Sequence, residues 1–256
     1  NCKLIHVHHS PDKTKTFKQY IIYIFNSFLA DKTILVSKRK ADSFLVKLNN
    51  FFSIKTKVII NGINHKIYKK SKTIKKKSFI MGMAARFHND KHQDLLIDLF
   101  QNFRHEFYKK KIFIEFAGYG PTLINLKQKV KALGLQEKIK FLGNLNQKEM
   151  IDWYSRLDLY VHLSKDETSS TAILQAMSIG LPILASNEGG NFGLRVKKNG
   201  LYNMMLCKND VKDIHAKLKI ILKDKVLQKK MSKLSNEIIK TKFNSKEMFK
   251  NYFEYF

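Results

Sequence analysis

A glutamate and a glutamine stand eight positions apart in the stretch Glu167-Thr-Ser-Ser-Thr-Ala-Ile-Leu-Gln175. With the following Ala176-Met-Ser-Ile-Gly-Leu-Pro-Ile-Leu-Ala-Ser186, the pattern predicts a loop, a helix, a tight turn and a buried strand. The start of such a helix presents unpaired N–H groups and a positive dipole end to a ligand. Hydroxyl groups that could donate to a phosphate lie at the same place, on Thr168, Ser169 and Ser170.

This stretch could therefore hold a sugar and its phosphate. Glu167 could accept hydrogen bonds from sugar hydroxyls, and Gln175 could meet a ribose diol if its face of the helix turns toward a cleft. The alternative is that the polar residues only cap the helix and that Gln175 is an ordinary helix residue. Taken alone, the capped helix is the simpler interpretation.

A second loop could bind a diphosphate. It follows a predicted strand and reads Gly82-Met-Ala-Ala-Arg86-Phe-His-Asn-Asp-Lys91-His92. Arg86 could clamp phosphate oxygens with two hydrogen bonds, and Lys91 could add a point charge. Ordinary surface charge explains the spacing equally well. Arg86 is the better signal, because the chain has only 5 arginines against 43 lysines.

A third loop, Gly118-Tyr-Gly-Pro121, contains two glycines that would let the backbone approach a ligand closely. A plain turn between a strand and a helix is the favoured interpretation of Gly118 and Gly120.

His9 ends the first predicted strand and is a candidate acid or base. A lone histidine is more often structural, so no role is assigned to His88, His92 or His162.

The segments around these loops alternate between strand and helix patterns. Strands are expected at residues 4–8, 33–36, 57–60, 78–81, 112–116, 139–142, 159–163 and 183–185. Helices are expected at residues 14–29, 41–48, 92–107, 147–157 and 211–227, with another beginning at Pro121. Such alternation is typical of an α/β fold with parallel sheets, whose ligands bind beyond the carboxyl ends of the strands. Residues 65–77 contain seven lysines and indicate an exposed linker between two such blocks.

The formal net charge of +27 on 256 residues is extreme. It would suit nucleic acid, an anionic membrane surface or acidic small molecules. Proteins that read nucleic-acid sequence rely on arginine, whereas here lysines are scattered over nearly every predicted helix. We therefore favour general surface basicity, with attraction to membranes, over specific nucleic-acid binding.

The sequence gives no argument for a catalytic metal. It has no Asp-x-Asp motif and no cluster of histidine, cysteine and carboxylate at metal-binding spacing. The two cysteines, Cys2 and Cys207, match no metal or redox motif and indicate a reduced, cytoplasmic setting. No window approaches the run of about 18 apolar residues that a membrane span requires. The 44% of hydrophobic residues suffices for a sizeable core.

Taken together and in this order, the segments resemble the retaining glycosyltransferases of the GT-B fold, in the group called family 4. The resemblance covers the chain from about residue 30 to the end. Five segments carry it, at residues 30–37, 58–64, 82–91, 163–190 and 243–252. The fourth segment resembles the family signature, in which two glutamates separated by seven residues precede Ala-Met, Gly-x-Pro and Gly-Gly.

The resemblance implies two Rossmann-like domains with parallel sheets. Residues 1–64 would be part of an N-terminal domain on the acceptor side, residues 65–77 the basic linker, and residues 78–240 the donor-binding domain. Residues 241–256 would form a helix that crosses back to the first domain. Family members carry further strands upstream, so the N-terminal domain is expected to be incomplete.

The resemblance also implies transfer of a hexose from a nucleotide diphosphate sugar to an acceptor hydroxyl, with retained anomeric configuration and without a metal or other cofactor. Arg86 and Lys91 would stabilise the departing diphosphate. Glu167 would hold donor-sugar hydroxyls, and Gln175 would occupy the place of the family's second glutamate at the ribose. His9 would lie where many members carry an important histidine. The donor-binding residues would further include Gly82, Gly118, Gly120, Thr168, Ser169 and Ser170.

The site departs from the family pattern at Gln175, at residues 168–170, where a Gly-rich step is usual, and at Gly193, where an acidic residue is usual. A neutral amide accepts weaker hydrogen bonds than a carboxylate does. Three functions stay open. The first is a glycosyltransferase for a bacterial envelope glycan (lipopolysaccharide, capsule or a lipid-linked glycan), acting at the cytoplasmic face of the membrane. The second is a degenerate, non-catalytic nucleotide-sugar binder, and the third and least favoured is a nucleic-acid-binding protein.

Overall fold

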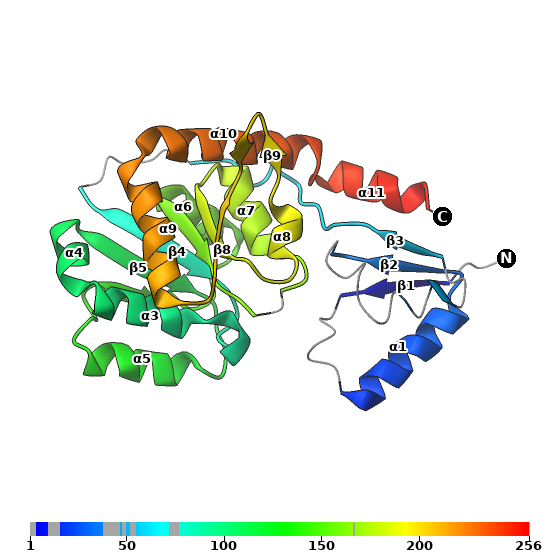
Figure 1. The fold of residues 1–256 in the computed structure, drawn as a ribbon, viewed down its shortest axis with the longest axis horizontal. Coiled ribbons are helices and arrows are strands. Elements are labelled where there is room, and N and C mark those ends of the chain that lie inside the picture. Colours follow the sequence, from blue (N-terminus) through cyan, green and yellow to red (C-terminus); the bar gives the residue numbers. More distant parts are fainter. Residues whose placement is uncertain are drawn as a thin grey trace.

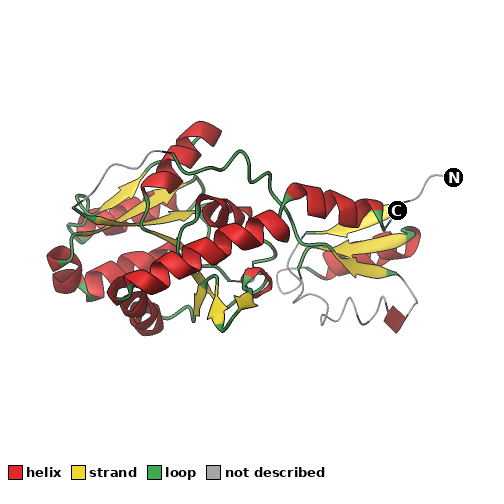
Figure 2. Ribbon diagram, turned by 90° about the horizontal axis from the view of Figure 1, so that it is seen from above, coloured by secondary structure: helices red, strands yellow, loops and turns green. Residues whose placement is uncertain are grey.

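The computed structural model describes residues 4–9, 16–37, 47, 50–51, 55–71, 77–165 and 167–255. The helix expected at residues 41–48 falls almost entirely outside these ranges. The described residues form two parallel sheets in separate lobes, shown side by side in Figure 1 and from above in Figure 2, and a short antiparallel pair of strands. This arrangement confirms the α/β fold expected from the alternation of strands and helices.

The larger sheet has six parallel strands in the order β11-β8-β7-β4-β5-β6. They are β4 (Phe79–Ala84), β5 (Ile112–Ala117), β6 (Ile139–Phe141), β7 (Leu159–His162), β8 (Ile183–Ser186) and β11 (Met205–Cys207). The strand order reverses between β4 and β7, which makes this point the topological switch of the sheet.

Helices cover both faces of the larger sheet (Figure 1). One face packs against α3 (Gln93–Asn102), α4 (Arg104–Lys109), α5 (Leu123–Ala132) and α9 (Val211–Lys223). The other packs against α6 (Gln147–Arg156), α7 (Thr171–Ile179) and α10 (Lys225–Thr241). Because side chains alternate along a strand, Met81 and Met83 of β4 join the first core, whereas Ala84 joins the second. Shorter elements are α8 (Asn191–Leu194), β9 (Lys197–Lys198) and β10 (Leu201–Tyr202).

The smaller sheet consists of β1 (Ile5–His8), β2 (Lys32–Leu35) and β3 (Thr56–Val58), which are parallel and adjacent in this order. Helix α1 (Phe17–Leu29) lies on one face of it and α11 (Ser245–Phe253) on the other (Figure 1). A capping box at Thr16 and Gln19 begins α1 by satisfying the first free N–H groups.

Two segments of chain run side by side between the lobes. The N–H of Ile63 donates to the carbonyl of Phe243 at 3.0 Å, and the N–H of Ser245 donates back to Ile63 at 2.9 Å. A side chain at Gly62 would have its Cβ only 2.4 Å from the carbonyl oxygen of Asn244, so this approach requires glycine. Helix α11 thereby reaches the smaller sheet while remaining fixed to the start of the linker.

Two expected helices are divided in the structure. The pattern at residues 92–107 forms α3 and α4, which are separated at Phe103. The pattern at residues 211–227 ends at Asp224, whose side chain accepts from the N–H of Leu227 at 2.8 Å and begins α10. Asp224 acts as the N-cap of a new helix, which apolar periodicity alone does not reveal.

Candidate active site

Two loops meet where the strand order of the larger sheet reverses. The loop after β4 leads through a short 3-10 helix, η2 (Asn89–Lys91), into α3, and the loop after β7 leads into α7. The N–H of Lys165 donates to the carbonyl of Asp90 at 2.7 Å and joins the two loops. The candidate site therefore lies at the carboxyl ends of β4 and β7, where parallel sheets bind ligands.

Lys91 and Glu167 are in direct contact at this point. The Lys91 Nζ lies 2.8 Å from Oε2 of Glu167 and 3.5 Å from Oδ2 of Asp90. The Lys91 and Glu167 side chains are only 16% and 14% exposed, so water screens this pair far less than it screens a surface salt bridge. The structure thus unites two residues that the sequence analysis singled out separately.

His162 is a further site residue, and the sequence analysis assigned it no role. It ends β7, its side chain is 3% exposed, and its Nε2 lies 3.2 Å from Oε2 of Glu167. Its Nδ1 lies 3.1 Å from the hydroxyl of Tyr160, which donates to the carbonyl of Ala84. Its position at the end of a buried strand, five residues before Glu167, was the signal that could have identified it.

The surroundings of Glu167 favour its ionised form. Burial alone would raise the pKa of this carboxyl group. The hydrogen bond and charge of His162, together with Lys91, outweigh burial and hold the pKa of Glu167 at about 2. Glu167 is therefore an anion at neutral pH, held between two basic side chains.

This carboxylate makes the stability of the protein depend on pH. The pKa of Glu167 is lower in the folded chain than its ordinary 4.5, so its stabilising effect is present above pH 4.5 and lost as the pH falls toward 2. We expect the difference in unfolding free energy between the wild type and Glu167→Gln to be about 1 kcal/mol larger near pH 6 than near pH 3.5. Urea unfolding at both pH values measures it, and equal differences would contradict the assignment.

A pair of glycines holds the backbone of Glu167 in place. A Cβ at Gly189 would lie 1.9 Å from the carbonyl oxygen of Glu167, and a Cβ at Gly190 would lie 1.5 Å from that of Thr168. The N–H of Gly190 also donates to the Glu167 carbonyl. Gly189 and Gly190 therefore allow their loop to pack closely against the backbone of Glu167 and Thr168.

We expect Gly190→Ala to destabilise the site severely. The φ of Gly190 is −72°, which alanine adopts freely, so only the missing space opposes the substitution. Overpacking against a fixed carbonyl is expected to lower the unfolding free energy by about 2 kcal/mol or more. The control is Gly143→Ala, where an added Cβ would meet no atom of the described residues within 4 Å, its chain neighbours aside, and only the positive φ of 70° is strained. Equal thermal midpoints for the two variants would contradict this explanation.

The hydroxyl residues at the start of α7 have different surroundings. Ser170 is the N-cap, and its Oγ accepts from the N–H of Ile173 at 3.3 Å, as the capping interpretation expects. The N–H of Thr168 donates to Oε1 of Glu167 at 3.3 Å. The Oγ of Ser169 is buried and has no hydrogen-bond partner among the described residues. Donor contacts by these three residues stay predictions.

The loop with Gly118 and Gly120 runs beside the loop of Arg86, joined to it by backbone hydrogen bonds of 3.1 and 3.0 Å. A Cβ at Gly118 would lie 2.1 Å from the carbonyl oxygen of Ala85, and one at Gly120 would lie 2.2 Å from that of Phe87. Loop packing thus accounts for both glycines without a ligand. The Arg86 side chain is exposed and forms no ion pair with any described residue.

Two predicted site residues lie away from this cluster. Gly82 is inside β4, and its Cβ position is occupied by Leu157 at 2.3 Å and Trp153 at 2.7 Å. Gly82 thereby makes room for Trp153 of α6 and for Leu157, and its donor-binding role stays a prediction. His9 follows β1 on the smaller sheet and lines a cavity of about 400 Å³ with residues of α11.

Gln175 lies in α7, half-buried, and its carboxamide is held between two tyrosines. Its Oε1 accepts from the hydroxyl of Tyr154 at 3.1 Å, and its Nε2 donates to the hydroxyl of Tyr68 at 2.9 Å.

The described residues contain no group of three or more potential ligands that could hold a metal ion. No helix in the described ranges has the length and apolar character needed to cross a membrane.

Several known proteins are similar to this chain in sequence or in fold. The family model of the glycosyl transferases group 1 matches residues 64–240. Protein CapJ of Staphylococcus aureus is 32% identical over 110 residues, 43% of this chain and 27% of CapJ. The O-antigen biosynthesis glycosyltransferase WclY of Escherichia coli is 26% identical over 230 residues, 87% of this chain and 60% of WclY. The chain thus spans only part of the length of these relatives.

Solved structures with the same fold include Anabaena HepE in complex with UDP and glucose, with a TM-score of 0.85 and 19% identity over 99% of this chain and 71% of HepE. Sucrose-phosphate synthase from Thermosynechococcus elongatus has a TM-score of 0.83 and 16% identity, over 100% of this chain and 67% of the synthase. These likenesses establish a GT-B fold. The family match covers well over half of the sequence, and the chain therefore belongs to the glycosyl transferases group 1.

Proposed function

We propose that this chain takes part in moving a sugar from a nucleotide diphosphate sugar to an acceptor hydroxyl, with retention of configuration and without a metal. The observation that carries the proposal is the contact between Lys91 and Glu167 at the switch point of the larger sheet. In this contact, a cation suited to a phosphate lies beside a carboxylate suited to sugar hydroxyls. The UDP and glucose in the HepE complex and the glycosyltransferase WclY support the same class of reaction.

In the proposed reaction, the bond between the anomeric carbon and the diphosphate breaks and a bond to the acceptor oxygen forms. Arg86 and Lys91 stabilise the negative charge that develops on the departing diphosphate, which is the largest electrostatic requirement of the step. Glu167 holds sugar hydroxyls close to the reacting carbon. His162, whose Nε2 lies 3.2 Å from Oε2 of Glu167, positions that carboxylate. His9 is proposed to act on the acceptor side.

The proposed pathway is synthesis of a bacterial envelope glycan on the cytoplasmic face of the membrane. The name of WclY, an O-antigen biosynthesis glycosyltransferase, supports this assignment. The net charge of +27 favours attraction to anionic lipid. Apolar side chains are also exposed on α1, at Phe17, Ile21, Ile22, Phe25, Phe28 and Leu29.

The direct test is a transfer assay with purified chain and a panel of UDP-, GDP-, dTDP- and ADP-sugars. We expect one donor to release its nucleotide in the presence of a sugar acceptor, with chelator present, and NMR of the product to show retained configuration. Inversion, or a strict requirement for a divalent metal, would refute the corresponding part of the proposal.

A second candidate function is nucleotide-sugar binding without transfer. The neutral amide of Gln175, where the family pattern has a carboxylate, favours it. In that case calorimetry will show nucleotide binding while every donor stays intact, even in the Gln175→Glu variant.

A further inference from the structure

The pairing of β4 with β5 continues beyond both strands, into two loops of the candidate site. The last strand pair is Ala84 with Ala117. Beyond it, the N–H of Phe87 donates to the carbonyl of Tyr119 at 3.0 Å, which keeps the same register. This register places Arg86 directly beside Tyr119. Because neighbouring strands lie about 4.8 Å apart, a ligand that contacts one of these two side chains is within reach of the other.

Tyr119 presents an open aromatic ring on a firmly held backbone. The residue is 67% exposed, and its side chain has no hydrogen bond or ring contact within the part of the chain that the structure describes. Gly118 and Gly120, on either side of it, leave no room for a Cβ against the neighbouring loop, so the backbone of Tyr119 is packed tightly. A tyrosine has only two side-chain torsions, and fixing its ring on a ligand therefore costs little conformational entropy.

Three neighbouring strands carry the site residues in a fixed order. The strands are β7, β4 and β5, and they are followed by Glu167, by Arg86 and Lys91, and by Tyr119, respectively. In a nucleotide diphosphate sugar, the diphosphate lies between the sugar and the nucleoside. A donor whose sugar lies at Glu167 and whose diphosphate lies at Arg86 and Lys91 therefore extends its nucleoside toward the end of β5.

We propose that the ring of Tyr119 binds the donor by stacking on the base of its nucleotide. This inference rests on the proposed function. Every base has a flat π-face that can stack on an aromatic side chain, so this contact supplies affinity and does not choose between bases. Tyr119 would thus hold the nucleoside while Arg86 beside it holds the diphosphate.

The test compares nucleotides with inorganic pyrophosphate, which has no base. UDP, GDP, dTDP, ADP and pyrophosphate are titrated into the purified chain by calorimetry. We expect Tyr119→Ala to weaken binding of the preferred nucleotide about tenfold, the effect of losing one base-stacking contact. Tyr119→Phe keeps the ring and is expected to change this affinity less than about twofold. The affinity for pyrophosphate is expected to be the same in the wild type and both variants.

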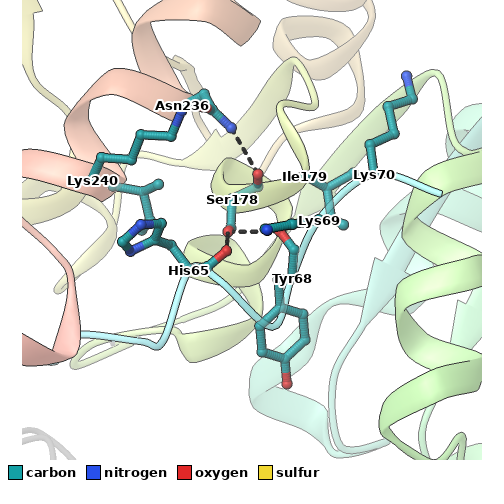
Figure 3. A pocket seen from close by; sticks show the side chains of 9 residues that line it. His65, Tyr68, Lys69, Lys70, Ser178, Ile179, Asn236 and Lys240 are labelled. Carbon is teal, nitrogen blue, oxygen red and sulfur yellow. Dashed lines mark hydrogen bonds between the residues drawn. The ribbon is translucent and has the colours of Figure 1, made fainter.

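A control is needed because a chain with a net charge of +27 attracts phosphates to lysines elsewhere. Figure 3 shows one such place, a pocket of about 240 Å³ whose described lining includes Lys69, Lys70 and Lys240 and no carboxylate. There the Ser178 hydroxyl of α7 lies 2.8 Å from the carbonyl oxygen of Tyr68 in the linker. Lys240→Met is the control, and we expect it to leave the affinity for the preferred nucleotide unchanged.

Thermal unfolding of each variant separates loss of binding from loss of folding. A wild type that binds none of the nucleotides refutes the proposed function itself. A wild type that binds, with Tyr119→Ala equal to it, refutes this inference alone. So does an equal loss for nucleotide and pyrophosphate, since Tyr119 would then shape the phosphate site and not hold the base. A loss in Tyr119→Phe as large as in Tyr119→Ala also refutes it, because the hydroxyl and not the ring would then make the contact.

Discussion

Arg86→Ala and Lys91→Met are each expected to lower kcat for sugar transfer by about 10²–10³-fold. The reason is that positive groups near the leaving diphosphate stabilise the negative charge that develops on it in the transition state. Lys91 is largely buried, and Arg86 is exposed and forms no ion pair with a described residue, so it is available to a phosphate. Steady-state kinetics with the donor found in the transfer assay measures both effects.

Matched controls come from surface cations elsewhere in the larger lobe. Lys129→Met removes a lysine that pairs with Asp98 at 2.6 Å on the surface, and Arg104→Ala removes a guanidinium that donates to the carbonyl of Leu133. Both controls are expected to keep full activity. They show whether a loss of activity comes from the place of the removed cation or only from lowering the net positive charge by one. An Arg86→Ala enzyme as active as the controls would contradict the assigned role.

Glu167→Gln is expected to lower kcat/KM for the donor about tenfold to a hundredfold, the range for losing hydrogen bonds to a charged group. Affinity for the free nucleoside diphosphate should be nearly unchanged, because Glu167 is assigned to the sugar and not to the nucleotide. Calorimetric titration of the nucleotide alone, beside kinetics with the complete donor, distinguishes these contributions.

The control for Glu167 is another buried carboxylate. Glu115 is 8% exposed and accepts from Trp153 at 2.9 Å and from Arg156 at 2.7 Å. Glu115→Gln therefore weakens a buried network away from the site, and we expect lower stability with unaltered donor kinetics. If both variants lose activity in proportion to their stability, Glu167 has a structural role only.

The sequence pattern predicted the strands of the larger sheet well, because they are short apolar runs buried on both faces. The edge strand β11 was missed, since its Met205–Cys207 segment is only three residues long. The division of one predicted helix at Asp224 was also missed, because a cap is a local hydrogen bond and the apolar stripe continues across it.

At the candidate site, the sequence pattern singled out Lys91 and Glu167 separately, and the structure brings the two side chains into contact. Contacts between distant elements could not be derived in this way. Nothing in the order of residues shows that Tyr68 of the linker touches Gln175. The tight packing of Leu157 and Trp153 against Gly82 is likewise a tertiary feature that the sequence pattern does not reveal.

We propose that the switch point of the larger sheet binds a nucleotide sugar through Lys91, Glu167 and Gln175. The most direct measurement follows backbone amide resonances of the isotopically labelled chain while a panel of nucleoside diphosphates and their sugars is added. We predict saturable shifts from one nucleotide at residues 86–91 and 167–175, extended at Glu167 when the sugar is present. Shifts confined to other parts of the chain, or none with any nucleotide, would contradict the account.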